Sequence, residues 1–247
     1  MKKTLVALAV AAALVPSLAM AEAGDIVVRL RATHISADES SSLGATTQAV
    51  NGAGTTHDGT TLYGTTAAEL RVDSNTIPEI DFSYYITKNI AAELILATGT
   101  RHDVKITGMT AGAAIQNANL GSVNLLPPTL TLQWHFNPDQ TFDPYVGAGL
   151  SYVRAMDNSL STTVDAGAGV KNLPIRISRN SFGPAIQAGF DYNLENKWLI
   201  NFDVKKIWFD TKVEGDLRPS GLGSGWSKID QLDVDPWVVS VGFGKKF

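Results

Sequence analysis

Apolar and polar residues alternate along much of this chain with a period of two, a pattern typical of β-strands whose two faces meet different surroundings. The alternation is found in eight runs, which span 26–33, 79–86, 90–97, 129–136, 146–152, 182–193, 198–209 and 237–247. In most runs one face is strongly apolar, and the other carries polar or small side chains. The pattern therefore predicts an all-β protein with eight antiparallel strands.

Two architectures produce such alternation: a membrane barrel, whose apolar face meets lipid, and a soluble sandwich, whose apolar faces pack together. The aromatic residues favour the barrel, because they are expected in two groups at opposite ends of the strands. The first group is Tyr84, Trp134, Phe136, Tyr192, Trp198 and Phe247, and the second is Tyr152, Phe182, Trp208 and Trp237. Two aromatic belts suit the two interfaces of a bilayer, so we predict a transmembrane β-barrel.

The segments between the runs alternate in length. Short turns are expected at 87–89, 137–143 and 195–197, and long segments rich in Gly, Ser, Thr and Asp at 36–75, 107–124, 157–181 and 212–233. Short periplasmic turns and long extracellular loops are typical of an outer-membrane barrel. The third strand is expected to continue past residue 97, with Arg101, Asp103 and Lys105 facing inward and Val104 and Ile106 facing outward.

The N-terminus has the features of a cleavable secretory signal. Two lysines precede the apolar stretch 5–15, Pro16 interrupts it, and Ala-Met-Ala follows as a small-x-small cleavage site. The apolar stretch is too short to cross a hydrocarbon layer of about 30 Å as a helix. We therefore expect cleavage after Ala21, with a signal peptide at 1–21 and the barrel at 22–247.

The C-terminus carries a second expected signal. Phe247 is the last residue, and Phe243 shares its outward face. This ending resembles the signal that is read by the outer-membrane insertion machinery. Together the two ends predict a protein of the outer membrane of a Gram-negative bacterium, inserted by that machinery and in contact with membrane lipid and lipopolysaccharide.

Composition narrows the possible chemistry. The chain has 20 Lys and Arg against 24 Asp and Glu, a formal net charge of −4, four His and no Cys. The acidic balance, without any basic cluster, argues against a nucleic-acid partner. The lack of Cys excludes disulfides and thiolate metal sites, and no His pair shows metal-ligand spacing such as HExxH. We expect neither a metal nor a cofactor.

Charges of both signs are expected on the inner face of the barrel. Those expected to form buried ion pairs are Arg29, Arg31, Glu79, Asp81, Asp191 and Asp203. Eight strands enclose an interior that side chains can fill, and buried charges need partners, so a plug of ion pairs is the main interpretation. A binding site for a charged solute is the alternative. Inward glycines such as Gly147 and Gly242 either leave a narrow tunnel or make room for the arginines.

Several stretches resemble the OmpW family of small outer-membrane barrels. They are LPPTL at 126–130, QWHF at 133–136, PYVGAG at 144–149, QAGFDY at 187–192 and DPWV at 235–238, and they occur in the family's order. The resemblance implies an eight-stranded barrel whose narrow, mostly apolar interior passes small hydrophobic molecules inward. It also implies that these molecules leave through the barrel wall into the membrane.

The resemblance indicates where the passage is narrowest. Ile95 stands at an inward position that is bulky and apolar in the family, whereas Lys205 replaces an aromatic residue found in some members. This lysine suggests a more polar constriction, paired with Asp203 or Asp191, and puts the family's hydrophobic gate in doubt. The residues expected to form the constriction and passage are Ile95, Lys205, Tyr85 and Phe209.

A conduit for small hydrophobic molecules is therefore the leading hypothesis. A plugged structural or surface-interaction barrel is the second. His34 and Ser36, expected near the outer interface, are a weak indication of a lipid A-modifying enzyme, and we expect no enzymatic activity. Apolar residues of the long loops form either a packed cap or an entrance for apolar ligands: Leu43, Val50, Leu62, Tyr63, Leu160, Val164, Val170, Leu173 and Ile175.

Overall fold

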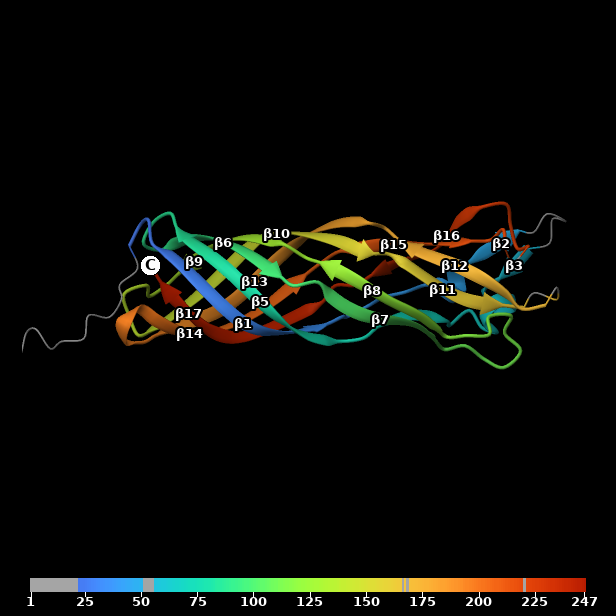
Figure 1. The fold of residues 1–247 in the computed structure, drawn as a ribbon, viewed down its shortest axis with the longest axis horizontal. Coiled ribbons are helices and arrows are strands. Elements are labelled where there is room, and N and C mark those ends of the chain that lie inside the picture. Colours follow the sequence, from blue (N-terminus) through green and yellow to red (C-terminus); the bar gives the residue numbers. More distant parts are fainter. Residues whose placement is uncertain (1–21, 51–55, 166, 168, 220) are drawn as a thin grey trace, which may run out of the picture.

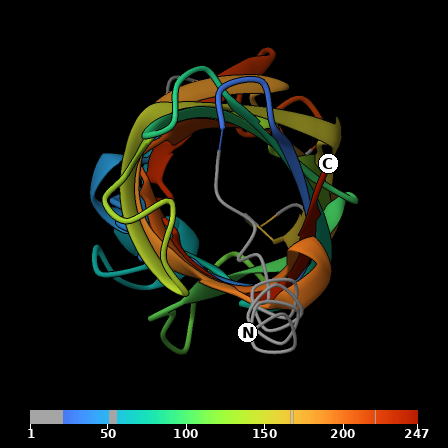
Figure 2. The ribbon, with the colours of Figure 1, turned by 90° about the vertical axis from the view of Figure 1, so that its left-hand side faces the viewer.

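Eight long strands form the body of the molecule. The computed structural model describes residues 22–50, 56–165, 167, 169–219 and 221–247, so the expected signal peptide at 1–21 lies outside the described residues. Viewed from one end, the long strands form a closed ring (Figure 2). They are β1 (Ile26–Ser36), β5 (Asn75–Tyr85), β6 (Ile90–Ala97), β9 (Thr129–His135), β10 (Phe142–Asp157), β13 (Asn180–Asn193), β14 (Trp198–Ile207) and β17 (Trp237–Lys246).

The ring is an antiparallel barrel. The strands pair in the order β13-β14-β17-β1-β5-β6-β9-β10, and β10 pairs back with β13 to close the ring. Closure leaves none of these strands with an unpaired edge, which a sheet surrounded by lipid requires. The predicted fold, an eight-stranded transmembrane β-barrel, is confirmed. No helix within the described residues is long and apolar enough to cross a membrane.

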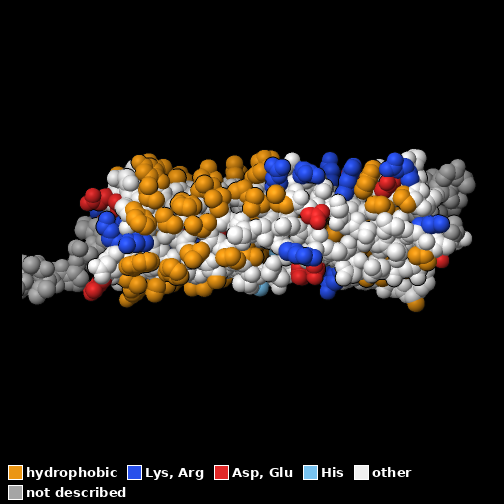
Figure 3. Space-filling view, in the orientation of Figure 1, with side chains coloured by type: hydrophobic (Ala, Val, Ile, Leu, Met, Phe, Trp, Pro, Cys, Tyr) orange, Lys and Arg blue, Asp and Glu red, His pale blue; other side chains and the backbone are white. Residues whose placement is uncertain are grey.

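The outer face of the barrel carries the apolar band that the alternation predicts. Hydrophobic side chains cover the left half of the visible face, and many of the charged side chains lie to the right of it (Figure 3). The expected aromatic residues lie at the surface at opposite ends of the long strands; Trp134 and Phe182, for example, are 49% and 73% exposed. Tyr152 and Phe182 are opposite each other on β10 and β13, with ring centroids 4.7 Å apart.

The long extracellular connections consist largely of strands that extend the barrel beyond the apolar band (Figure 1). Three continue the barrel sheet: β4 (Glu69–Val72), β7 (Thr100–Thr107) and β8 (Asn119–Leu126). Four form a second sheet, β11 (Ser159–Val164), β12 (Lys171–Ile177), β15 (Asp210–Asp216) and β16 (Trp226–Asp233). Smaller elements are β2 (Gln48–Val50), β3 (Thr56–Asp58), α2 (Leu43–Thr46) and α3 (Gly59–Tyr63), while the 3-10 turn η1 (Glu195–Lys197) joins β13 to β14.

These extensions pack around an apolar core, which we call the cap. Its buried members include Leu43, Leu62, Tyr63, Leu160, Val164, Leu173 and Ile175, whereas Val170 is exposed. Two interpretations of the apolar loop residues were open, a packed cap or an entrance for apolar ligands. Most of those that the structure describes fit the packed cap. Burial raises the pKa of the Tyr63 phenol to about 12, so this side chain stays neutral at the pH of the medium.

The expected facing of β7 is wrong. His102, Val104 and Ile106 are buried, while Arg101, Asp103 and Lys105 are exposed. Inward positions have odd numbers up to Ala97 and even numbers from Thr100 onward, because the strand is interrupted at residues 98–99 between β6 and β7. A shift of one residue turns every following side chain to the other face.

Candidate functional site

Two apolar cavities lie one above the other inside the molecule. The upper cavity lies inside the cap, leaves about 40 Å³ free for the centre of a water-sized molecule, and is lined by residues such as Leu70, Leu120 and Leu160. The lower cavity, inside the mouth of the barrel, leaves about 60 Å³ free in the same sense and is lined by Ile95 and Val238, among others. Both cavities are predominantly apolar.

The two cavities share part of their walls. The shared residues are Val72, Leu125, Val153, Phe209 and Val234. Phe209 follows β14 in sequence, and its backbone N–H donates to Asp235 Oδ1 over 3.0 Å. Since the same side chains line both spaces, they lie between the upper and the lower cavity, and we call them the neck.

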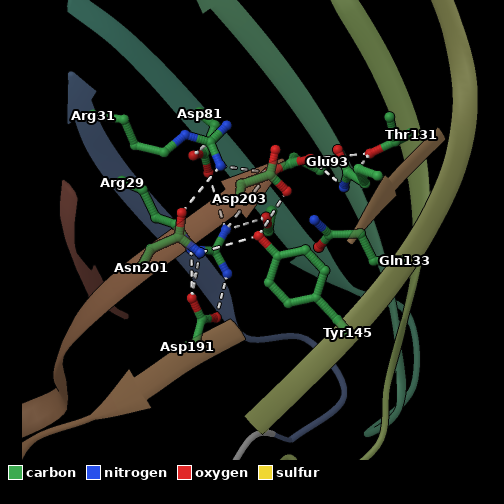
Figure 4. A network of polar contacts seen from close by, with 12 residues as sticks. Arg29, Arg31, Asp81, Glu93, Thr131, Gln133, Tyr145, Asp191, Asn201 and Asp203 are labelled. Atoms are coloured by element: carbon green, nitrogen blue, oxygen red, sulfur yellow. Dashed lines mark hydrogen bonds and ion pairs between the residues drawn. The ribbon is translucent and has the colours of Figure 1, made fainter. Parts of the chain in front are cut away.

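A network of buried charges lies inside the barrel (Figure 4). Arg29 donates from Nη1 to Asp81 Oδ1 over 3.0 Å and from Nη2 to Asp191 Oδ2 over 2.5 Å. Arg31 Nη2 lies 2.6 Å from Glu79 Oε1 and 3.0 Å from Asp81 Oδ2. All five side chains are at most 5% exposed. Charges this deeply buried need such pairing, because each loses its hydration.

Lys205 joins the network from β14. Its ammonium donates to Asp203 Oδ1 over 2.7 Å, and Tyr145 donates its hydroxyl to Asp203 Oδ2 over 3.0 Å. Glu79 and Lys205 belong to the network and also line the lower cavity. The network is therefore the polar floor of that cavity.

Inward glycines make room for the arginines. A Cβ at Gly242 would lie 2.7 Å from Arg31 Cα and 2.9 Å from its Cγ, and one at Gly244 would lie 2.7 Å from Arg29 Cγ. A larger side chain at either of these two positions on β17 would collide with the arginine beside it. Of the two roles considered for the inward glycines, Gly242 and Gly244 thus fit the packing of the network.

Aromatic residues occupy the periplasmic end below the network. The His135 ring lies between Tyr85 and Tyr145, with centroids 5.0 Å from each. His135 Nδ1 is 2.7 Å from Asp143 Oδ2, and Tyr85 OH is 3.3 Å from the imidazole. All of these side chains are buried. Together with the network, they occupy the barrel interior between the lower cavity and the periplasm.

The residues expected at the constriction separate into two places. Ile95, Lys205 and Phe209 line the lower cavity together, whereas Tyr85 lies at the periplasmic end and lines neither cavity. The six charges expected to form ion pairs all belong to the network. Asp203, one of the two partners considered for Lys205, is the one it contacts.

Other members of the site were not singled out from the sequence. Glu93 contacts Arg31 at 3.4 Å and accepts hydrogen bonds from Thr131 and Gln187. Asn201 donates to Asp191 Oδ1 over 2.8 Å. Both Glu93 and Asn201 take inward positions in the period-two alternation of their strands. This position is a signal that could have identified them from the sequence. The neck residues Leu125, Val153 and Val234 lie outside the predicted barrel runs, and no such signal marks them.

The features considered for catalysis and metal binding have other contacts. His34 Nδ1 lies 2.9 Å from Thr76 Oγ1, and within the described part of the chain no hydrogen bond joins it to Ser36. Among residues that the structure describes, no group of three or more His, Asp and Glu is arranged to hold a metal ion. The cavities and their polar floor are therefore the candidate site.

Phe243 and Phe247 both lie on the outer surface at the periplasmic end. Phe243 is 53% exposed and Phe247 62%. The backbone of Phe247 pairs with Ile26, since its N–H donates to the Ile26 carbonyl over 2.8 Å. The last residue thus completes the seam between the first and last strands of the barrel.

Comparisons with known proteins agree with this architecture. The sequence model of the OmpW family matches residues 22–247. Outer membrane protein W of Vibrio cholerae is 31% identical over 249 aligned residues, covering 100% of both chains. The uncharacterised outer-membrane protein y4mB of Sinorhizobium fredii is 39% identical over 192 residues, covering 78% of this chain and 75% of that protein.

A solved structure shows the same fold. The crystal structure of the outer membrane protein OprG from Pseudomonas aeruginosa aligns with a TM-score of 0.71 and 30% sequence identity, covering 92% of this chain and 98% of that one. The family match spans the whole barrel, and the relatives are outer-membrane proteins. This chain therefore belongs to the OmpW family of outer-membrane β-barrels.

Proposed function

We propose that this barrel is a passive conduit for small hydrophobic molecules, which enter beneath the cap and leave through the barrel wall into the membrane. The observation that carries the proposal is the pair of apolar cavities that adjoin at the neck. Such cavities lower the free energy of an apolar molecule by removing its surface from water. A path through them would let the molecule pass the polar outer surface of the membrane.

The buried network argues against an exit straight into the periplasm. Below the lower cavity an apolar molecule would meet Arg31, Glu79 and Lys205, and farther down the adjacent rings of Tyr85 and His135. Passage would require breaking ion pairs from which water is excluded, at a cost of several kcal/mol. A sideways exit avoids this cost.

A break in the barrel wall beside the lower cavity supports a sideways exit. The pairing of β6 with β9 ends at Ile95 and Thr129, and the pairing of β7 with β8 starts at Thr100 and Leu125. Pro127, which cannot donate a ladder hydrogen bond, lies in this interval and lines the lower cavity. A wall with fewer strand-to-strand bonds opens at a lower cost than the rest of the barrel.

A relative's name supports the substrate class. The dibenzothiophene metabolism operon protein PahQ of Pseudomonas aeruginosa is 26% identical over 175 residues, covering 71% of this chain. Dibenzothiophene is an apolar molecule of fused rings. We include contacts with outer-membrane lipid, with lipopolysaccharide and with the insertion machinery in the proposal, since the apolar band and terminal Phe247 suit them.

The second candidate is a plugged structural or surface-interaction barrel. The dense network and the packed cap favour it, because both close the interior against bulk water. A barrel of this kind would not need two adjoining apolar cavities, however, and rigid packing would more simply fill them. Uptake measurements distinguish the two candidates.

The test compares uptake of a monoterpene by cells with and without the protein. We expect faster uptake with the protein, and a return to the background rate in Ile95→Trp, whose indole would fill the lower cavity. Ile80→Trp is the matched control, since Ile80 lies on the lipid-facing side of β5 and is 38% exposed. Equal uptake with and without the protein, across a panel of apolar compounds, would refute the conduit and favour the structural barrel.

A further inference from the structure

The lower cavity has an apolar wall but a polar floor. Its polar lining residues are Glu79, Thr100, His102, Thr129 and Lys205. Glu79 and Lys205 come from the buried network, and their side chains are 5% and 2% exposed. A molecule that only needs an apolar environment gains nothing from charged groups at the end of its path. The floor therefore raises the question of which ligand group it suits.

Most polar atoms around the cavity already have partners. Thr100 Oγ1 donates to the Leu125 carbonyl over 3.2 Å, and Thr129 Oγ1 donates to Ser151 Oγ over 3.0 Å. His102, on β7, has its Nδ1 2.8 Å from the Asp73 carbonyl oxygen. These three side chains are oriented by the protein itself.

Lys205 and Glu79 keep unused hydrogen-bonding capacity. The Lys205 ammonium has three N–H groups, and among the described residues it donates one of them, to Asp203. Glu79 Oε1 accepts from Arg31 Nε over 2.7 Å, whereas Oε2 accepts from none of the described side chains or backbone groups. The floor thus offers a donor and an acceptor to the same cavity.

The charges of the floor limit the ligand group that can be bound. The network holds five carboxylates, from Glu79, Asp81, Glu93, Asp191 and Asp203, against three cations, from Arg29, Arg31 and Lys205. A ligand carboxylate would be repelled by this acidic excess, and a ligand ammonium would have to approach the ammonium of Lys205, which lines the cavity. A neutral hydroxyl avoids both, because it can accept from Lys205 and donate to Glu79 at once.

We propose that the lower cavity selects apolar molecules that carry one hydroxyl group, such as hydrophobic alcohols and phenols, and that Lys205 and Glu79 bind this hydroxyl. The inference rests on the proposed function and specifies its substrate class. Hydrogen bonds to charged groups are stronger than neutral ones, and a molecule that lacks the hydroxyl leaves the floor unsatisfied. Selection therefore takes place at the floor, while the wall accepts any apolar body that fits.

The test uses three ligands with the same fused-ring body: naphthalene, 2-methoxynaphthalene and 2-naphthol. Their dissociation constants for the purified barrel in detergent are measured by calorimetry, each corrected for partition into micelles without protein. We expect 2-naphthol to bind about tenfold or more tighter than naphthalene, with the methoxy compound, which can only accept, in between. This series needs no variant and stands even where substitutions disturb folding.

A variant then locates the effect. Lys205→Met removes the donor and keeps the length of the side chain, so the preference for 2-naphthol over naphthalene should shrink toward unity. Lys105→Met on β7 is the control, because Lys105 is exposed. Both variants are first checked for the heat-modifiable migration of a folded barrel.

The outcomes separate this inference from the proposed function. Equal corrected affinities for all three ligands would overturn the hydroxyl selection and leave the conduit standing. An undiminished preference in folded Lys205→Met would overturn the role of the floor. If none of the three ligands binds and monoterpene uptake also matches the background, the conduit fails as well.

Discussion

Arg29 and Arg31 illustrate how single residues determine the interior of this barrel. Each guanidinium is fully buried, and each contacts carboxylates from two or more other strands. The attraction in such pairs roughly offsets the cost of removing the charges from water, so their main effect is to specify one arrangement. That arrangement closes the lumen across β1, β5, β6 and β13, and it leaves Lys205 at the border with the lower cavity.

Lys205→Met should destabilise the barrel by about 1–3 kcal/mol, because Asp203 would remain buried after losing its cation. Asp203 would keep its hydrogen bond from Tyr145, so the loss should be partial. Unfolding in urea with lipid vesicles measures the difference from the unchanged protein. Lys105→Met should leave the free energy of unfolding unchanged. An equally stable Lys205→Met barrel would show that the Lys205–Asp203 pair contributes nothing measurable.

At the level of elements, a long strand can run first through the apolar band and then into the part of the molecule beyond it. β10 runs from Phe142 to Asp157, pairing first with β9 inside the apolar band and then with β8 beyond it. β6 and β7 divide the same path into two strands, and the interruption between them changes which residues face inward. Strand interruptions thus separate the lipid-facing barrel from the cap and create the break in the wall beside Pro127.

The last strand has an additional expected role in assembly. Deleting Phe247 should leave processed but uninserted protein in the periplasm, because the terminal aromatic of the expected insertion signal and its pairing with Ile26 are both lost. Cell fractionation and heat-modifiable migration in gels report the result. Phe142→Ala is the matched control, since it removes another exposed aromatic side chain, 50% exposed, from the periplasmic end. Normal insertion without Phe247 would refute the assignment of the signal.

Across the whole molecule, the interior changes from apolar to charged along the barrel axis. The cap encloses the upper cavity, the neck lies between it and the lower cavity, and the network closes the path below. The break in pairing beside Pro127 lies at the level of the lower cavity, above the floor. A molecule that follows the apolar interior would therefore reach the break in the barrel wall before it reaches the periplasm.

The neck predicts how uptake depends on side-chain size. Phe209→Ala should raise the rate of monoterpene uptake, because it joins the two cavities more widely, and Phe209→Trp should lower it. Phe202→Ala is the control, since Phe202 faces lipid on β14 and is 36% exposed. The same rate in both Phe209 variants would place the limiting step elsewhere, for instance at the break in the wall.

The number of strands, their two faces and the residues that line the membrane part of the lumen could all be predicted from the sequence. Period-two alternation is a local property, and a closed barrel turns it directly into inside and outside, as Arg29, Asp81 and Ile95 show. The aromatic belts follow for the same reason. Resemblance to a family added the expectation of an apolar passage.

Only the tertiary structure decided how the parts beyond the barrel strands are arranged. The facing of Val104 depends on an interruption that resets the alternation, and the position of Tyr85 below the network depends on strand tilt and closure. The neck unites Val72, Leu125, Val153, Phe209 and Val234 from five separate segments. Such contacts arise between residues far apart in the chain, so a pattern that extends over a few neighbouring residues carries no information about them.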